Sequence, residues 1–172
     1  MTSPPETESL TATTGLEETA GSASPAPAAT TDEKARVLCV DDEPRVLEGL
    51  TLSLGRKYKV ATATSGLDAI ELIKKEPPYA VIISDMRMPE MDGAAFLKNA
   101  RQLTPDSVRV LLTGHSDVDA AIAAVNQGQI FRFLSKPCPP PDLLAAVEAG
   151  VHMNQLITAE RVLLEQTLRG SI

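Results

Sequence analysis

Five short runs of apolar residues divide most of the chain, and polar residues, glycine or proline bound each of them. The runs lie at residues 35–40, 58–63, 79–84, 108–112 and 130–134. Most are apolar at successive positions, which is typical of strands buried on both faces of a parallel sheet. The pattern therefore predicts five strands.

Between these runs the apolar residues recur every three or four positions, which is the spacing of helices. Pro44 suits the first turn of one helix, and Pro77 and Pro78 end another. Ser116 or Asp117 is expected to cap the helix that follows the fourth strand. Strands that alternate with helices predict an α/β fold, a doubly wound five-stranded parallel sheet with five helices on its two faces.

The two ends of the chain depart from this alternation. Residues 1–34 consist largely of Thr, Ser, Pro, Ala and Glu, so we expect a disordered tail that buries too little apolar surface to offset its ordering entropy. Residues 35–149 carry the strands and helices of one domain. Helical spacing then continues to residue 168 without proline, so the last helix is expected to be extended, and residues 150–172 form a helical linker or coiled-coil extension.

Charge and composition narrow the function. The net charge is −7 and no Lys/Arg cluster occurs, which argues against a nucleic-acid partner. The two cysteines, Cys39 and Cys138, are far apart, and Cys39 within an apolar run is expected to be a small buried hydrophobe. With no signal-peptide pattern and no apolar run near the ~20 residues of a membrane span, we expect a cytoplasmic protein without a membrane partner.

Chemistry-bearing residues stand where the predicted strands end. Asp41 and Asp42 follow the first strand, Asp85 the third, Thr113 the fourth and Lys136 the fifth. Doubly wound sheets bind their ligands beyond the carboxyl ends of the strands. The topology therefore gathers three carboxylates, a hydroxyl and an ammonium at one mouth.

Three acids so close together need a counter-charge. Two carboxylates ~4 Å apart repel by roughly 4 kcal/mol at an effective dielectric near 20. Oxygen ligands suit Mg²⁺, and no His or Cys stands among these strand-end ligands, which argues against zinc. Metal-assisted hydrolysis and a structural metal remain open, but phosphoryl transfer explains more residues, because an aspartate can be the nucleophile while Lys136 and Thr113 bind the transferred group.

The order and spacing of these motifs resemble the receiver domain of two-component response regulators, which has a CheY-like, flavodoxin-like fold. The resemblance covers about residues 35–149 and rests on four strand-end motifs: Asp41-Asp42-Glu43, Asp85-Met86-Arg87-Met88-Pro89 with Met91-Asp92-Gly93, Thr113-Gly114, and Lys136-Pro137.

The resemblance assigns a role to each acid. It implies that Asp85 is the phosphoacceptor, and that Asp42, Asp85 and the backbone carbonyl of Arg87 bind Mg²⁺ directly. Asp41 would hold the metal through water. Asp92, in the loop after the phosphoacceptor, is expected to be a turn or helix-cap residue rather than a ligand.

The resemblance also implies a switch. Thr113 would swing onto the phosphoryl group, Lys136 would pair with it, and Pro137 would be a cis-proline beside that lysine. Phe133 would turn inward when Thr113 moves, although a purely structural core position is an alternative for Phe133.

The implied function is a signalling switch rather than an enzyme, which catalyses only its own aspartyl phosphorylation and dephosphorylation. The implied donor is a sensor histidine kinase or a histidine phosphotransfer protein, and the switch would control an output domain or a partner. Two other classes of protein fit less well. The intact acid–Thr–Lys set speaks against a purely phosphorylation-independent interaction module, and a haloacid-dehalogenase-like phosphatase would need an acid where Arg87 stands.

The last segment of the chain indicates a further domain. Residues 126–133 and 160–171 resemble response regulators that carry an HD-type output domain, which we expect beyond the chain. The extension forms either a parallel coiled-coil homodimer or a signalling helix that packs on the receiver or on a further domain. Gly150, Asn154 and Arg161 weaken the coiled-coil seam.

Overall fold

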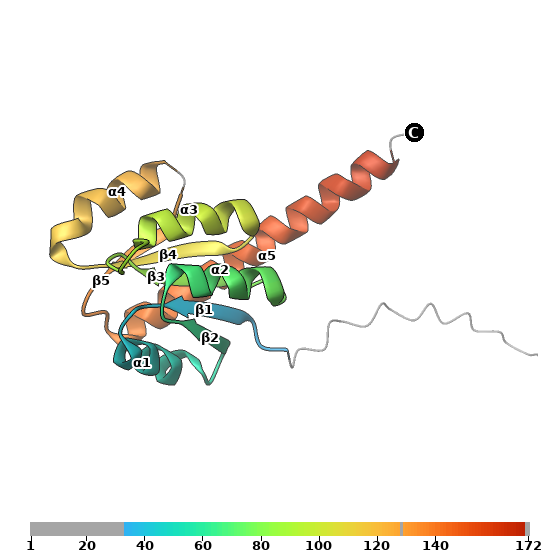
Figure 1. The fold of residues 1–172 in the computed structure, drawn as a ribbon. Helices are drawn as coiled ribbons and strands as arrows, with labels where there is room; N and C mark the ends of the chain where they lie inside the picture. The colour runs from blue at the N-terminus through green and yellow to red at the C-terminus, as the bar shows by residue number, and fades with distance from the viewer. Residues whose placement is uncertain (1–32, 128, 171–172) are drawn as a thin grey trace, which may run out of the picture. The chain divides into compact units, whose positions relative to one another are not determined.

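The computed structural model describes residues 33–127 and 129–170, in which five strands alternate with helices (Figure 1). The strands are β1 (Arg36–Val40), β2 (Lys59–Ala63), β3 (Val81–Asp85), β4 (Val108–Thr113) and β5 (Arg132–Ser135). The helices are α1 (Pro44–Leu54), α2 (Gly66–Lys75), α3 (Gly93–Leu103), the 3₁₀ turn η1 (His115–Asp117), α4 (Val118–Asn126) and α5 (Pro140–Gly170). The expected tail, residues 1–34, lies outside the described residues except for its last two.

All five strands are parallel, in the order β2-β1-β3-β4-β5. The predicted doubly wound α/β fold is therefore confirmed. The boundaries differ by one or two residues, because Ile130 and Phe131 precede β5, whose pairing with β4 starts at Arg132. This edge strand is only half-buried, so its apolar pattern marked its limits poorly.

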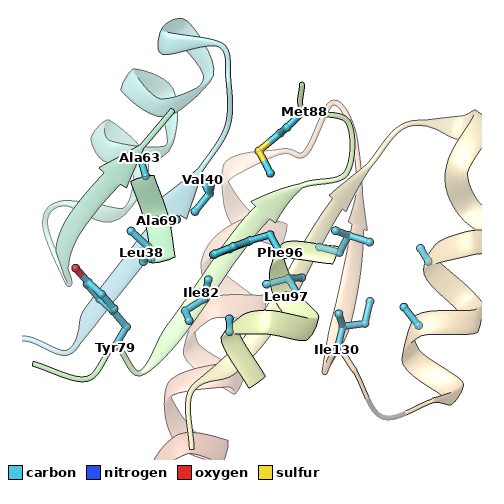
Figure 2. Close-up of a cluster of buried hydrophobic side chains, with 14 residues drawn as sticks. Leu38, Val40, Ala63, Ala69, Tyr79, Ile82, Met88, Phe96, Leu97 and Ile130 are labelled. Carbon is cyan, nitrogen blue, oxygen red and sulfur yellow. The ribbon is translucent and has the colours of Figure 1, made fainter. Parts of the chain in front are cut away.

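Alternate residues of the central strands serve two cores. Leu38 and Ile82 point toward α2 and α3, where they pack with Phe96 and Leu97 (Figure 2). Val37 on the next pleat faces the opposite side, with α1 and α5. Both faces of the sheet are thus buried, which explains the continuous apolar runs.

Cys39 belongs to the α1 and α5 side of the core and is fully buried, as expected for a small hydrophobe. Burial raises the pKa of its thiol to about 12.

Helix ends follow local chemistry in three places. Pro44 is the first residue of α1, the Ser65 hydroxyl accepts from the amide of Asp68 at the start of α2, and the Asp92 carboxylate accepts from Ala95 N at 2.8 Å at the start of α3. The cap role expected of Asp92 is confirmed.

The side-chain cap predicted for α4 is wrong, because no capping hydrogen bond forms there. Asp117 directly precedes α4, but its side chain makes no capping hydrogen bond there. A short 3₁₀ turn, η1, comes between β4 and α4 instead, and the Asp117 carboxylate is held elsewhere.

Helix α5 is 31 residues long, and its first half lies against the sheet. Gly150 sits so close to β3 and β4 that an added Cβ would be 2.9 Å from Val81 Cγ2. From residue 159 to residue 170 every position is exposed. No helix among the described residues combines the length and the hydropathy needed to cross a bilayer.

Candidate functional site

Two buried acids and one exposed acid meet at the carboxyl ends of β1 and β3. Asp41 is fully buried, Asp85 is 8% exposed, and Asp42 is exposed. Their carboxylate oxygens lie within 4.8 Å of one another. Asp41 Oδ1 also accepts a hydrogen bond from the amide of Glu43 at 2.9 Å. The structure therefore brings together the three acids that the sequence placed at the strand ends.

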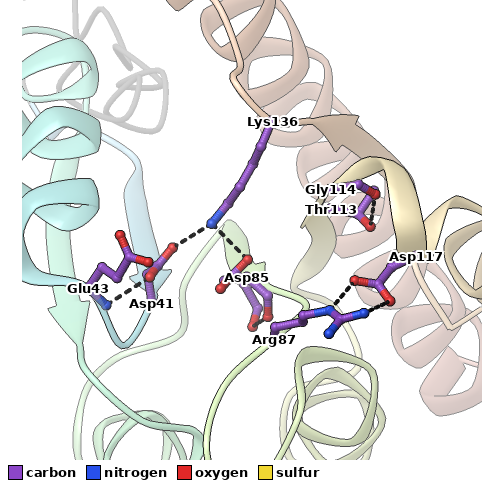
Figure 3. A network of polar contacts seen from close by, with 9 residues as sticks. Asp41, Glu43, Asp85, Arg87, Thr113, Gly114, Asp117 and Lys136 are labelled. Atoms are coloured by element: carbon purple, nitrogen blue, oxygen red, sulfur yellow. Dashed lines mark hydrogen bonds and ion pairs between the residues drawn. The ribbon is translucent and has the colours of Figure 1, made fainter.

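Lys136 extends from the end of β5 into this acidic cluster (Figure 3). Its Nζ lies 2.8 Å from Asp85 Oδ1 and 3.2 Å from Asp41 Oδ2. The peptide bond between Lys136 and Pro137 is cis. One ammonium thus bridges two of three carboxylates, and the cluster keeps an excess of negative charge.

The electrostatics of the cluster reflect burial as much as pairing. Burial raises the pKa of Asp41, and the Asp85 charge adds to this, whereas the Glu43 amide and Lys136 lower it. For Lys136, burial lowers the pKa, but the carboxylates of Asp85 and Asp41 outweigh burial, so its pKa is raised. The lysine is firmly charged, yet it only partly relieves the cost of a buried aspartate beside another.

This donor set fits a hard divalent cation. Three carboxylates supply oxygen ligands only, which is the preference of Mg²⁺. A cation bound there would also neutralise charge that Lys136 leaves uncompensated. The Arg87 backbone carbonyl and the water-mediated role of Asp41 stay predictions.

Thr113 ends β4 beside the acids and is fully buried. Its hydroxyl donates to the carbonyl oxygen of Gly114 at 3.2 Å, while its own carbonyl accepts from the amide of Lys136 at 2.9 Å. Phe133, half-buried on β5, packs against the core on the α2 and α3 face. The hydroxyl expected to bind a phosphoryl group is therefore held by the backbone.

A charged contact that the sequence did not reveal spans the mouth of the site. The Arg87 guanidinium, two residues after Asp85, donates from Nε to Asp117 Oδ2 at 2.7 Å and from Nη2 to Asp117 Oδ1 at 3.2 Å. The hydrogen bond with Arg87 lowers the pKa of Asp117, and the same contact raises the pKa of Arg87. The partners are 30 residues apart, so no local pattern could have joined them.

Comparison with known proteins assigns this arrangement to a family. The response regulator receiver domain model matches residues 37–148, which spans β1 through the first part of α5. The chain belongs to the response regulator receiver domain family. All the strand-end residues described above lie within the matched region of this receiver domain.

Curated relatives extend the match. The receiver domain is 36% identical over 125 residues to the hydrogenase transcriptional regulatory protein HoxA of Cupriavidus necator, covering 73% of this chain and 26% of HoxA. It is 36% identical over 116 residues to the DNA-binding transcriptional regulator NtrC of Escherichia coli, covering 67% of this chain and 24% of NtrC. The chain therefore spans about a quarter of the length of these relatives.

Solved structures agree. One described as the adenylate cyclase from Rhodopirellula baltica superposes with a TM-score of 0.75 at 43% identity, covering 77% of this chain and 98% of the other. The signal receiver domain of an HD domain-containing protein from Pseudomonas fluorescens Pf-5 gives a TM-score of 0.67 at 30% identity, covering 72% and 98%. The receiver fold is thus shared with chains whose descriptions differ widely.

Proposed function

We propose that the receiver domain accepts a phosphoryl group on the Asp85 carboxylate, with Mg²⁺ held by the acidic cluster. The observation that carries the proposal is the position of Lys136 Nζ, 2.8 Å from Asp85 and 3.2 Å from Asp41, where the three carboxylates meet. A purely structural ion pair would need one acid. Here Asp85, which is 8% exposed, stands beside both a lysine and further acids, as an acyl-phosphate site requires.

The donor proposed is a phosphohistidine on a sensor histidine kinase or a phosphotransfer protein. An Asp85 oxygen attacks phosphorus, the phosphorus–nitrogen bond breaks with its electron pair staying on the ring nitrogen, and the imidazole leaves neutral, keeping the proton on its other nitrogen. Bound Mg²⁺ would neutralise part of the negative charge on the transferred phosphoryl group. Lys136 pairs with one phosphoryl oxygen, and Asp42 with Asp41 and Asp85 would hold the metal. Later attack by water on phosphorus regenerates the Asp85 carboxylate and releases phosphate.

The signal would arise from Thr113. Its hydroxyl must leave the Gly114 carbonyl to donate to a phosphoryl oxygen on Asp85. That movement would open space behind β4 for Phe133, whose ring is only half-buried. The switch would then change the surface made by α4, β5 and α5.

The extension, residues 150–172, is proposed to lead to an output domain of a cytoplasmic regulator. The relatives, in which the matched segment makes up only about a quarter of the length, support a further domain; an HD-type output stays a proposal. Gly150, Asn154 and Arg161 of the predicted seam contact β3 or Asp106 within the same chain. This favours a signalling helix over a coiled coil that starts at residue 150, and a homodimer would rely on the exposed positions from residue 159 onward.

The test is phosphorylation in vitro. The protein is incubated with phosphoramidate and Mg²⁺, and its intact mass is measured together with its molar mass by light scattering. We expect one added phosphoryl group that is lost with EDTA and in Asp85→Asn, and a rise in molar mass only if the exposed end of α5 pairs two copies.

Asp92→Asn is the matched control, because it lies in the same loop and an asparagine still caps α3. It should take up the phosphoryl group at the normal rate. Uptake by Asp85→Asn equal to that of the native protein would refute Asp85 as the acceptor.

A further inference from the structure

The Arg87–Asp117 ion pair joins the two loops on either side of the phosphoacceptor (Figure 3). Arg87 belongs to the loop between β3 and α3, and Asp117 ends η1, between β4 and α4. Nη2 of Arg87 also donates to Ser116 Oγ at 3.3 Å, so one guanidinium holds two consecutive residues of η1. The Asp117 side chain is only 16% exposed, which fixes one half of this otherwise solvent-facing pair.

The same segment is tied to Thr113. The Gly114 carbonyl accepts from the Thr113 hydroxyl at 3.2 Å and from the backbone amide of Asp117 at 3.2 Å. One carbonyl therefore connects the switch hydroxyl with the residue that Arg87 holds. Asp85, Arg87, Asp117, Gly114 and Thr113 form a continuous chain of covalent and polar links around the site.

The start of α4 lacks a capping side chain of its own. Neither η1 nor α4 has a side-chain cap, although Asp117 occupies the capping position. Its carboxylate is instead engaged by Arg87. The position of η1 thus depends on a pair made across the mouth of the site rather than on the helix itself.

We propose that the Arg87–Asp117 ion pair is a latch that holds η1 in its unphosphorylated position and thereby keeps the Thr113 hydroxyl on Gly114. This inference rests on the proposed phosphorylation of Asp85. A phosphoryl group there places about two negative charges two residues from Arg87, where they compete with Asp117 for the guanidinium. When Thr113 leaves the Gly114 carbonyl, η1 loses the link that oriented it, so the two events favour each other.

The test compares Arg87→Gln, Asp117→Asn and the double variant. Because each removes the Arg87–Asp117 ion pair, we expect all three to be phosphorylated by phosphoramidate about two- to fivefold faster than the native protein, with no further gain in the double variant. Backbone amides of residues 114–120 should exchange hydrogen faster by a similar factor before any donor is added.

Arg161→Gln is the matched control, because Arg161 Nε makes a similar 2.6 Å bond to Asp106 Oδ2 outside the site. It should change neither the phosphorylation rate nor exchange at residues 114–120. Slower phosphorylation in Arg87→Gln with a normal rate in Asp117→Asn would show that Arg87 acts on the donor instead, and would overturn the latch.

Phosphorylation and hydrogen exchange test the two proposals separately. If the native protein takes up no phosphoryl group, the proposed function fails, while the exchange rates at residues 114–120 still test the role of the Arg87–Asp117 ion pair. Unchanged exchange at residues 114–120 in both single variants would refute the latch whatever the outcome of phosphorylation.

Discussion

The two ends of the sheet treat charge in opposite ways. At the carboxyl end, Asp41 and Asp85 are buried within reach of Asp42, and Lys136 is the ammonium bound between the first two. At the amino end, each acid of an ion pair meets one base, although Arg36 Nε and the Tyr79 hydroxyl are buried there without a hydrogen-bond partner among the described residues. There Asp106 pairs with Arg161 of α5.

The amino end continues this pattern in its backbone. The Asp106 carbonyl accepts from Asn154 at 2.8 Å, and the Ser107 hydroxyl donates to the Tyr79 carbonyl. The Asn154 bond fastens α5 to the receiver about two turns past the end of the family match at residue 148.

This difference indicates that the carboxyl end of the sheet serves the chemistry of the site, whereas the amino end serves the stability of the fold. Buried acids near one another lower stability, and burial already raises the pKa of Asp41. A fold retains such a cluster where a cation or a transferred group can relieve it. The amino end has no comparable cluster of acids among the described residues, so changes there should affect stability and the course of α5 without affecting phosphorylation.

The largest contrast is expected from adding one methyl group at each end. A Cβ at Gly93 would collide with the backbone carbonyl oxygen of Asp85, which cannot move without displacing the site. At Gly150 the nearest atom belongs to the Val81 side chain, which can shift slightly. We expect Gly93→Ala to lower the free energy of unfolding by about 2–3 kcal/mol and Gly150→Ala by about 1 kcal/mol, measured by urea denaturation.

Gly49→Ala is the control, because nothing lies within 4 Å of a Cβ there and the residue is inside α1. It should stabilise the protein by about 0.5–1 kcal/mol. A loss at Gly150 as large as that at Gly93 would mean that the amino end is as rigid as the site.

The second contrast uses Mg²⁺. At about ten times its dissociation constant, a ligand that binds only the folded state adds about 1.4 kcal/mol to the free energy of unfolding. We expect such a gain in the native protein and little of it in Asp41→Asn. Without Mg²⁺, Asp41→Asn should be slightly more stable than the native protein, by about 0.5–1 kcal/mol, because a buried charge beside Asp85 is removed.

Asp106→Asn gives the corresponding measurement at the amino end. Its response to Mg²⁺ should equal that of the native protein. Equal Mg²⁺ stabilisation of Asp41→Asn and the native protein would place the ion outside the acidic cluster.

The sequence predicts the residues at the strand ends better than the long-range side-chain contacts. The strand-end acids, Thr113 and Lys136 were predictable, because each comes after an apolar run and parallel topology brings all carboxyl ends to one edge. The bonds of Asp117 and Asp106 were not, since their partners are 30 and 55 residues away in sequence. Local propensity offered Ser116 or Asp117 as the helix cap, but a tertiary ion pair with Arg87 engages the Asp117 carboxylate instead.

The smallest effect is expected at the anchor of α5. Asp106→Ala removes the partner of Arg161 but leaves the backbone carbonyl that binds Asn154, so the helix should loosen only beyond that residue. We expect a loss of about 0.5–1 kcal/mol, reduced by added salt, and faster amide exchange from about residue 158 to residue 165. Exchange at Thr113 should stay unchanged.

Glu165→Gln is the control, because it leaves the Arg161–Asp106 bond intact and removes only the 3.4 Å contact within α5. If Asp106→Ala instead changed the rate at which Asp85 is phosphorylated, the two ends of the sheet would be coupled. Helix α5 would then influence the phosphorylation site as well as respond to it.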